Sequence, residues 1–369
     1  MRIFLSAGEA SGDACAAALV EELRRTGKPF IFEGVGGNLL QAKIGPLAAN
    51  SAAWGAISIV QSLGVFFEAR RGGMAARRQM AKGEPGLFIP IDFGFFNIRQ
   101  AGWAKRHGWK VLYFMPPGSY KRENQGRHLS AVTDAVVTPF PWSAEILRER
   151  GVNARFFGHP IKQLIRERGP VMDRPREGIA ILPGSRSTEV ARHLPMVAAL
   201  LKEWSIEDRR LEFAVAPNFS LPAFRASWDA LAPGRDDSFT QADTYGVLAR
   251  ARAAIVCSGT ATLEAALVRC PHVVTYRVTK AMAREAKLIR FKRPQYIALP
   301  NIVLDRPLVP ELAGLEVAPA AIRTCLEPLL LDGPDRSGQL AGFEEIDHIL
   351  GPDDAITKTA QFVIETTGR

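Results

Sequence analysis

Closely spaced metal or disulfide ligands are missing from the sequence. Its 369 residues include four cysteines without a Cys-x-x-Cys pair and six histidines without a His-Glu-x-x-His run. Zinc sites and disulfide frameworks depend on such spacing, so we expect no metal ion and no other cofactor. The four cysteines are expected to be small buried residues: Cys15, Cys257, Cys270 and Cys325.

Long apolar runs are missing as well. A helix that crosses a bilayer needs roughly 18 consecutive apolar residues, and no stretch of this sequence reaches that length. The first apolar run meets Glu9 too early for the core of a secretory signal peptide, which indicates a cytoplasmic protein. The chain is nevertheless 47% hydrophobic and 23% charged, as in globular proteins, and its length favours two domains.

The balance of charge is basic. Lys and Arg together number 47 against 38 Asp and Glu, which gives a formal net charge of +9. This excess favours phosphates, anionic lipid surfaces or nucleic acid as partners. Nucleic acid ranks last, because the sequence has no recognition motif and no interleaving of aromatic and basic residues.

Short apolar runs alternate with helix-like segments along the whole sequence. The runs are residues 2–7, 30–32, 87–91, 111–115, 135–137, 155–157, 178–182, 211–216, 253–257 and 272–276. Such alternation predicts parallel sheets with crossover helices. The pattern restarts in the second half, so we predict an α/β chain of two Rossmann-like, doubly wound domains that face a cleft.

The two expected domains are separated by a charged, proline-bearing stretch. We expect an amino-terminal domain at residues 1–160, a linker at 161–176 and a second domain at 177–345. Residues 346–369 show no strand pattern, and we expect them to form a helix that packs back on the amino-terminal domain.

Both halves begin with a strand that runs into small polar residues and then a helix. In the first half this loop contains Gly8, Glu9, Ser11, Gly12 and Asp13. In the second half it is the sequence PGSR at residues 183–186. Free backbone N–H groups and the positive end of a helix favour an anion at such loops. Neither loop matches a Walker A or a G-x-G-x-x-G pattern, which argues against an ATPase or a dehydrogenase.

Candidate donor-binding residues lie in the second half. The hydroxyl and N–H groups of Ser258, Gly259 and Thr260 suit a pyrophosphate, and the carboxylate of Glu264 suits ribose hydroxyls. A helix cap formed by Ser258 or Thr260 is the alternative that this segment alone favours. Arg186 suits a departing diphosphate through paired hydrogen bonds, and a plain surface arginine is the alternative.

Asp92 is the candidate catalytic residue. It follows the apolar run at residues 87–91, at the carboxyl end of a predicted strand, where ligands bind in open α/β sheets. A carboxylate there would remove the proton from an acceptor hydroxyl. Local sequence fits equally well with Asp92 as a helix cap or as a partner of Arg99.

A membrane-binding segment is a further hypothesis. Residues 56–67 are apolar and are followed by Arg70, Arg71, Arg77 and Arg78. The segment is too short to span a bilayer, but an amphipathic helix with a basic end would lie on a membrane surface. A core helix with a solvated basic end fits equally well.

Together these motifs resemble those of lipid-A-disaccharide synthases. The matching stretches in the first half are AGEASGD at 7–13, GVGG at 34–37, ID at 91–92 and GHP at 158–160. Those in the second half are LPGSR at 182–186, SGTATLE at 258–264, VVTYR at 273–277, LPNI at 299–302 and LVPEL at 308–312. Their order and spacing follow the family pattern along nearly the whole chain.

The resemblance implies a metal-independent, inverting glycosyltransferase of the two-Rossmann (GT-B) type. Its substrates would be UDP-2,3-diacylglucosamine and 2,3-diacylglucosamine 1-phosphate, and its products UDP and the disaccharide 1-phosphate precursor of lipid A, made at the inner-membrane surface of a Gram-negative bacterium. Asp92 would be the general base, and the loop at residues 8–13 would face the cleft. Arg186, Glu264 and Asn301 would lie on the donor-nucleotide side.

Two departures from the family pattern fall in the first half. The family's IDAPDFN is IDFGFFN at residues 91–97, so its proline and second aspartate are absent from the segment Phe93 to Phe96, and its SPSVWAWR is MPPGSYKR at Met115 to Arg122. The donor motifs are kept, so we expect UDP-sugar binding to be more secure than the identity of the acceptor. A related UDP-sugar transferase or epimerase with another acceptor, and a non-catalytic UDP-sugar-binding homologue, remain alternatives.

Overall fold

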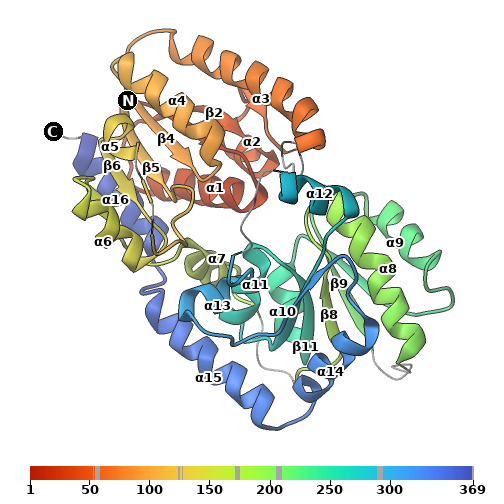
Figure 1. Cartoon of the computed structure of the whole chain (residues 1–369). Coiled ribbons are helices and arrows are strands. Elements are labelled where there is room, and N and C mark those ends of the chain that lie inside the picture. Colours follow the sequence, from red (N-terminus) through yellow and green to blue (C-terminus); the bar gives the residue numbers. More distant parts are fainter. Residues whose placement is uncertain are drawn as a thin grey trace. The chain divides into compact units, whose positions relative to one another are not determined.

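The structure, a computed structural model, describes residues 1–52, 54, 59–123, 125–126, 128–170, 175–204, 210–288 and 294–367. The chain divides into two compact units, Met1–Leu164 with Leu350–Arg369, and Ile165–Ile349. Each unit is built on one sheet, and all strand pairs within the described residues are parallel (Figure 1).

The first unit has a seven-stranded sheet in the order β3-β2-β1-β4-β5-β6-β7. Its strands are β1 (Arg2–Ala7), β2 (Ile31–Gly36), β3 (Ala49–Asn50), β4 (Leu87–Ile91), β5 (Lys110–Phe114), β6 (Ala135–Val137) and β7 (Ala154–Arg155). Its helices are α1 (Ala10–Arg25), α2 (Asn38–Ile44), α3 (Ile59–Met80), α4 (Gly94–Arg106), α5 (Leu129–Val132), α6 (Pro141–Glu149) and α16 (Ala355–Thr367). Helix α7 (Pro160–Arg168) runs across the boundary between the units and overlaps the expected linker.

The strand order of this sheet reverses between β1 and β4. The chain builds outward from β1 to β3 and then returns to the other side of β1, so crossover helices cover both faces, with α1 on one and α3 and α4 on the other (Figure 1). Strands covered on both faces are continuous apolar runs, and every residue of β4 is buried. The carboxyl ends of β1 and β4 form a topological switch point, where sheets of this kind bind ligands.

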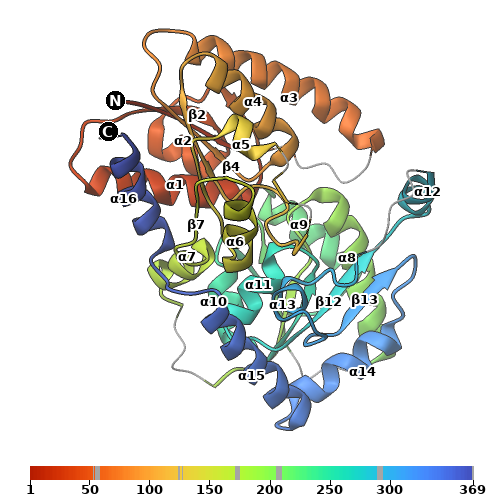
Figure 2. The ribbon, with the colours of Figure 1, turned by 60° about the vertical axis from the view of Figure 1, so that its left-hand side comes forward.

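The last helix of the chain belongs to the first unit. Helix α16 packs against α1, and the rings of Phe157 and Phe362 meet edge to face with centroids 5.8 Å apart (Figure 2). The side-chain oxygen of Gln163 accepts hydrogen bonds from the backbone N–H groups of Ile356 and Thr357 at 2.7 and 3.0 Å. These bonds satisfy two of the donors that the first turn of a helix leaves unpaired.

The second unit repeats the arrangement with six strands in the order β10-β9-β8-β11-β12-β13. Its strands are β8 (Ile179–Leu182), β9 (Leu211–Val215), β10 (Ser238–Gln241), β11 (Ala253–Cys257), β12 (His272–Arg277) and β13 (Glu311–Gly314). Its helices are α8 (Ser187–Glu203), α9 (Leu221–Asp229), α10 (Thr244–Arg250), α11 (Thr260–Leu267), α12 (Lys280–Leu288), α13 (Leu299–Leu304), α14 (Pro319–Leu330) and α15 (Pro334–Ile349). Its switch point lies between β8 and β11.

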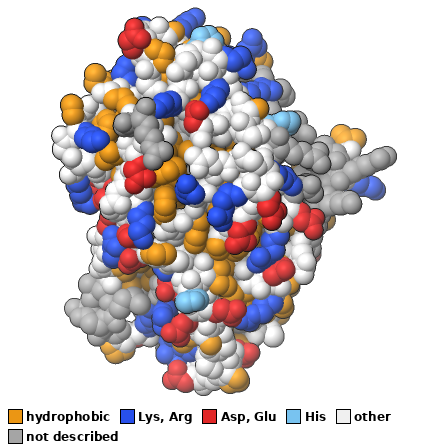
Figure 3. All heavy atoms as spheres, turned by 90° about the vertical axis from the view of Figure 1, so that its left-hand side faces the viewer, with side chains coloured by type: hydrophobic (Ala, Val, Ile, Leu, Met, Phe, Trp, Pro, Cys, Tyr) orange, Lys and Arg blue, Asp and Glu red, His pale blue; other side chains and the backbone are white. Residues whose placement is uncertain are grey.

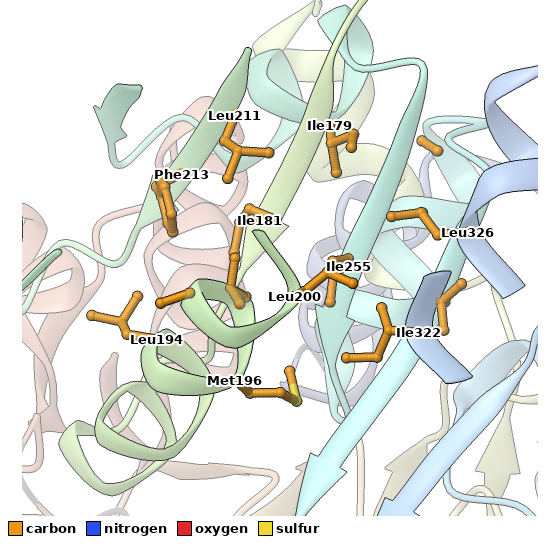
Figure 4. Packing of buried hydrophobic residues seen from close by; sticks show 14 of the residues in the cluster. Ile179, Ile181, Leu194, Met196, Leu200, Leu211, Phe213, Ile255, Ile322 and Leu326 are labelled. Carbon is orange, nitrogen blue, oxygen red and sulfur yellow. The ribbon is translucent and has the colours of Figure 1, made fainter. Parts of the chain in front are cut away.

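One face of this second sheet is packed by α8 and α14. Figure 4 shows Leu200 of α8 and Ile322 of α14 against Ile181 and Ile255 of the sheet, all at most 3% exposed. Burying each such side chain contributes about 1.5–3 kcal/mol, so the core holds the strand ends of the second switch point in place. The prediction of two Rossmann-like, doubly wound sheets is confirmed.

Candidate active site

Asp92 lies at the carboxyl end of β4, beside β1. Its backbone and that of Phe93 have left-handed φ angles of +47° and +50°, which residues with a side chain seldom adopt. The buried amide of Asn97 supports this corner: its Nδ2 donates to the carbonyls of Ser6, Ile91 and Asp92 at 2.9, 3.1 and 2.9 Å. Backbone conformations of this kind persist where surrounding bonds over-determine them, and they concentrate at functional sites.

Neighbouring strands add to this support. The phenol of Tyr113 in β5 donates to the carbonyl of Asp92 at 2.9 Å, and the hydroxyl of Ser6 in β1 donates to Oδ1 of Asn97 at 2.6 Å. The backbone N–H of Asp92 also donates to the carbonyl of Phe114 at 3.1 Å. The alternative in which Asp92 only caps the next helix is not observed, since the residue before α4 is Phe93.

The environment of Asp92 changes its acidity. Burial, the larger cause, and the negative charge of Glu9 raise the pKa of its carboxyl group, the N–H of Phe93 lowers it, and together they bring this pKa to about 6. A carboxyl group with this pKa is mostly ionised at neutral pH and is a stronger base than an ordinary aspartate. These are the properties of a general base.

The loop between β1 and α1 is shorter than the sequence suggested. Only Gly8 and Glu9 lie outside regular structure, because α1 begins at Ala10 and therefore includes Ser11 and Gly12 in its first turn. Gly8 is covered by the ring of Phe93, and a Cβ atom on Gly8 would lie 2.1 Å from that ring. The two loops of the switch point thus pack directly on each other.

Asp13 has a different position from the one expected of a ligand-facing residue. It is 6% exposed, and its carboxylate accepts N–H bonds from Gly37, Leu39 and Leu40 at 2.7, 2.9 and 3.2 Å. Burial raises its pKa, and these three bonds lower it. Asp13 therefore caps α2 and holds the GVGG turn, which is a structural role.

The two altered segments of the first half contact one another. Gly94 approaches Pro117 so closely that a Cβ atom on Gly94 would lie 2.5 Å from the proline ring. The family pattern has proline and serine at these two places, so the glycine and the proline of this chain fit each other. Phe93 also joins Trp54 and Phe96 in an aromatic cluster with ring centroids 5.2–6.1 Å apart. The side chain of Phe95 lies outside the described residues.

In the second unit, the loop from β8 to α8 presents Arg186. This residue is the N-cap of α8, its side chain is 28% exposed, and its Nη1 lies 2.8 Å from Oε1 of the buried Glu189. The other oxygen of Glu189 accepts the N–H groups of Ser185 and Arg186 at 3.1 and 3.2 Å. Gly184 has a φ of +110°, and a Cβ there would lie 2.4 Å from Glu189. Glu189 thus positions Arg186. An acidic residue three positions after an N-cap is the sequence signal that predicts this contact.

The neighbouring loop leads from β11 into α11. Its N-cap is Gly259, with a φ of +149°, so the alternative of a side-chain cap by Ser258 or Thr260 is not observed. The Ser258 hydroxyl donates instead to the carbonyl of Ile297 at 2.9 Å. Within the described part of the chain, the N–H groups of Thr260 and Ala261 have no acceptor. They suit an oxygen of a diphosphate.

Glu264 lies in the second turn of α11. The phenol of Tyr245 in α10 donates to its Oε1 at 3.3 Å, and the guanidinium of Arg168 lies over the Tyr245 ring at 5.1 Å. Burial raises the pKa of Glu264, while the Tyr245 bond and the charge of Arg168 lower it. The residue as a whole is half-buried, and its contact with a ribose hydroxyl stays a prediction.

Asn301 is held by hydrogen bonds within the protein, and its contact with the donor stays a prediction. It is 1% exposed, its Oδ1 accepts the N–H groups of Leu308 and Val309, and its Nδ2 donates to the carbonyl of Val309 and to Glu311, all at 2.8–2.9 Å. Glu311 also accepts the N–H group of Ala298 at 2.8 Å. These bonds engage both polar atoms of the Asn301 side chain and hold the segment that leads from α13 to β13.

The structure thus gathers the expected residues in two places. Glu9 and Asp92 lie at the switch point of the first unit, and Arg186 lies with residues 258–260 at that of the second. Among the described residues, no group of His, Cys, Asp and Glu side chains is arranged to hold a metal ion.

Solved structures with the same fold cover nearly the whole chain. One is titled as a Staphylococcus aureus MnaA–UDP co-structure, with a TM-score of 0.67 at 11% identity over 100% of this chain and 97% of that one. Another is Acinetobacter baumannii MurG, with a TM-score of 0.57 at 15% identity over 99% of both chains. At these identities the likeness shows the fold, and it places the chain in the class of proteins with two Rossmann-like domains of the GT-B type.

Sequence comparison gives the family. Residues 3–352 match the family model for lipid-A-disaccharide synthetase. The lipid-A-disaccharide synthases of Pseudomonas syringae pv. tomato and Geobacter sulfurreducens are 32% and 29% identical to this chain. The alignments cover 100% of this chain and 98% of each relative. The chain belongs to the lipid-A-disaccharide synthetase family.

Proposed function

We propose that this chain transfers 2,3-diacylglucosamine from its UDP ester to 2,3-diacylglucosamine 1-phosphate, with release of UDP. Family membership and the names of the full-length relatives support this reaction. The observation that carries it is Asp92, a carboxylate at a switch point whose pKa is raised to about 6 and whose backbone is fixed by Asn97.

The proposed reaction is one displacement. Asp92 takes the proton of an acceptor hydroxyl while that oxygen bonds to the anomeric carbon of the donor, and the bond from this carbon to the UDP oxygen breaks. The configuration at the carbon inverts. Negative charge that develops on the leaving diphosphate is stabilised by Arg186 and by the N–H groups of Thr260 and Ala261. The first unit binds the acceptor, and the second binds the donor nucleotide.

We also propose that the protein works at the cytoplasmic surface of the inner membrane, where its acylated substrates reside. Helix α3 supports this proposal, since Phe67 and Met74 are 56% and 42% exposed and Arg70 and Arg71 are exposed with them. Residues 55–58 and the side chains of 59–66, which include most of the apolar segment, lie outside the described residues. The opposite side of α3 packs on α4 (Figure 1). The alternative that this segment is a core helix therefore applies to that side only.

Helix α12 of the second unit supports the same proposal. Lys280, Arg284 and Lys287 recur at helical spacing on one side and are exposed, and Leu288 next to them is 84% exposed. Basic and apolar side chains in this arrangement bind anionic lipid surfaces. On the face drawn in Figure 3, by contrast, basic and acidic side chains are mixed. None of the helices in the described ranges has both the length and the apolar character to traverse a bilayer.

The test is formation of radiolabelled disaccharide from the two acylated glucosamines, with and without phospholipid vesicles. The wild-type protein should release one UDP for each disaccharide. Asp92→Asn should reduce turnover by at least about 10²-fold, because it removes a general base. Full turnover by Asp92→Asn would refute its role, and absence of disaccharide with the wild-type protein would refute the reaction.

A further inference from the structure

The segment after β5 contains an exposed pair of basic residues, Lys121 and Arg122. It begins beside the catalytic corner, because β5 pairs with β4 and the carbonyl of Phe114 accepts the N–H of Asp92 at 3.1 Å. Further along it, Pro117 packs on Gly94, two residues after Asp92. The basic pair therefore follows a segment that lies against the corner carrying the proposed base.

This segment is shaped from within by a buried glutamine. Gln125 is 4% exposed, and its Nε2 donates to the carbonyls of Lys121 and Ser119, the latter at 3.4 Å. Its Oε1 accepts the hydroxyl of Ser143 in α6 at 2.6 Å. The Ser119 hydroxyl bonds in turn to the carbonyl of Pro116. These bonds order the backbone that presents the two basic side chains.

Arg122 is oriented by an aromatic stack. Its guanidinium carbon lies 4.4 Å from the centre of the Trp142 ring, and Trp142 stacks on Phe140 with centroids 4.8 Å apart and planes 17° from parallel. A guanidinium over an aromatic face keeps its N–H groups in its own plane, where they suit the paired oxygens of a phosphate. The family pattern has tryptophans within the altered segment, whereas here α6 supplies the ring beneath Arg122.

We propose that Lys121 and Arg122 bind the 1-phosphate of the acceptor sugar. The proposal rests on the proposed function, since it assigns a subsite to that acceptor. The phosphate carries the formal charge of the acceptor, and the hydroxyl that reacts must lie at Asp92, so the phosphate needs a cationic group on the same edge of the sheet. The altered segment keeps the arginine of the family pattern at Arg122 and has Lys121 where that pattern has a tryptophan.

The test compares two acceptors that differ only in this group, 2,3-diacylglucosamine 1-phosphate and 2,3-diacylglucosamine. With the phosphorylated acceptor, Arg122→Ala should raise the KM for the acceptor roughly 10- to 100-fold, the range of a lost charge-assisted pair, and leave the KM for the donor unchanged. With the dephosphorylated acceptor, the wild-type protein should already be poor, and Arg122→Ala should change nothing further. The KM of Arg122→Lys for the phosphorylated acceptor should lie between those of the wild type and Arg122→Ala, since lysine keeps the charge without the planar guanidinium.

Arg225→Ala is the matched control. Arg225 is an exposed arginine in α9 that lies over Phe239 at 5.0 Å, so its loss removes an equal charge and a similar stack from the second unit. This variant should leave the KM for both acceptors unchanged. Equal losses with both acceptors, or an unchanged KM in Arg122→Ala, would overturn the proposal. If Arg122→Ala does not fold, Lys121→Ala and Arg122→Lys carry the same comparison.

Calorimetric binding of glucosamine 1-phosphate, with glucosamine as the second arm, separates failure of the subsite from failure of the reaction. Binding that requires both the phosphate and Arg122 supports the subsite even if no disaccharide forms. Binding of both sugars alike, or no loss in Arg122→Ala, overturns it while leaving the transfer reaction to its own test.

Discussion

The side-chain amide of Asn97 donates to the carbonyl of Asp92 at 2.9 Å, and the same Nδ2 atom also reaches the carbonyls of Ser6 and Ile91. One buried amide therefore joins the end of β1 to the corner after β4. Since that corner carries two left-handed residues in succession, the direction of the Asp92 carboxylate depends on Asn97.

Asn97→Ala should lower both turnover and stability. It removes the amide donor from the carbonyls of Ser6, Ile91 and Asp92, of which the last keeps the Tyr113 phenol, at a cost of about 1–3 kcal/mol for each buried group left unsatisfied. Turnover at saturating substrate should fall at least about tenfold, with KM changed much less. The reason is that the Asp92 carboxylate loses its orientation, while no contact with the substrate is removed. Kinetics and urea denaturation measure the two effects. Ser6→Ala, which removes only the 2.6 Å bond to Oδ1, is the control and should retain most activity. Unchanged kcat in folded Asn97→Ala would contradict the positioning role.

The pH dependence of turnover should follow Asp92. With a pKa raised to about 6, the carboxylate is protonated below this pH, so the rate should fall as pH decreases through about 6. Glu9→Gln removes a nearby negative charge that raises this pKa, so the acidic limb of the profile should move to lower pH. Glu21→Gln removes a charge from α1, the helix that follows Glu9, where the Glu21 carboxylate forms an ion pair with Lys43, and it should leave the limb in place. A profile that does not move in Glu9→Gln would argue against the coupling.

Asp92→Asn should stabilise the protein while it abolishes transfer. The folded pKa lies above the ordinary value of 3.8, so between about pH 4 and 6 the folded state holds a proton that the unfolded state has lost. Stability attributable to Asp92 therefore falls as pH rises through this window, and above it the ionised group destabilises the fold. Asparagine also tolerates a left-handed backbone. We expect up to about 3 kcal/mol of added stability at pH 8 and little at pH 4, measured by urea denaturation. Equal effects at both pH values would refute the electrostatic origin.

The sequence predicted the strands that form buried apolar runs, because alternation of apolar runs and helices is local information, but it missed the short edge strands β3, β10 and β13. It placed Asp92 and Arg186 after the correct strands. It did not separate ligand-facing residues from structural ones, since Asp13 and Asn301 receive their partners from segments that only the fold brings near them. The role of Asn97 was hidden for the same reason, because its oxygen partners lie on β1 and β4.

Gly184→Ala should weaken donor binding. The residue has a φ of +110°, and a Cβ would lie 2.4 Å from the carboxylate of Glu189, so the loop must shift and Arg186 with it. We expect the KM for the UDP-sugar to rise roughly tenfold, equivalent to about 1.4 kcal/mol, with the KM for the acceptor unchanged. Gly338→Ala on α15, where a Cβ meets open space, is the matched control and should behave as wild type. A normal donor KM in Gly184→Ala would show that this loop does not bind the nucleotide.

Replacing Lys280, Arg284 and Lys287 of α12 by Gln should weaken binding to vesicles that contain anionic lipid. Each basic residue near such a surface contributes about 1 kcal/mol, so the triple variant should bind on the order of 100-fold less tightly, and added salt should reduce the difference. Its disaccharide synthesis should suffer with vesicle-bound substrates and not with detergent-dispersed ones. The control replaces Lys202, Arg225 and Arg323, three exposed basic residues on other helices of the second unit, and changes net charge equally. If both triple variants lose vesicle binding to the same extent, total charge rather than the α12 surface governs association with the membrane.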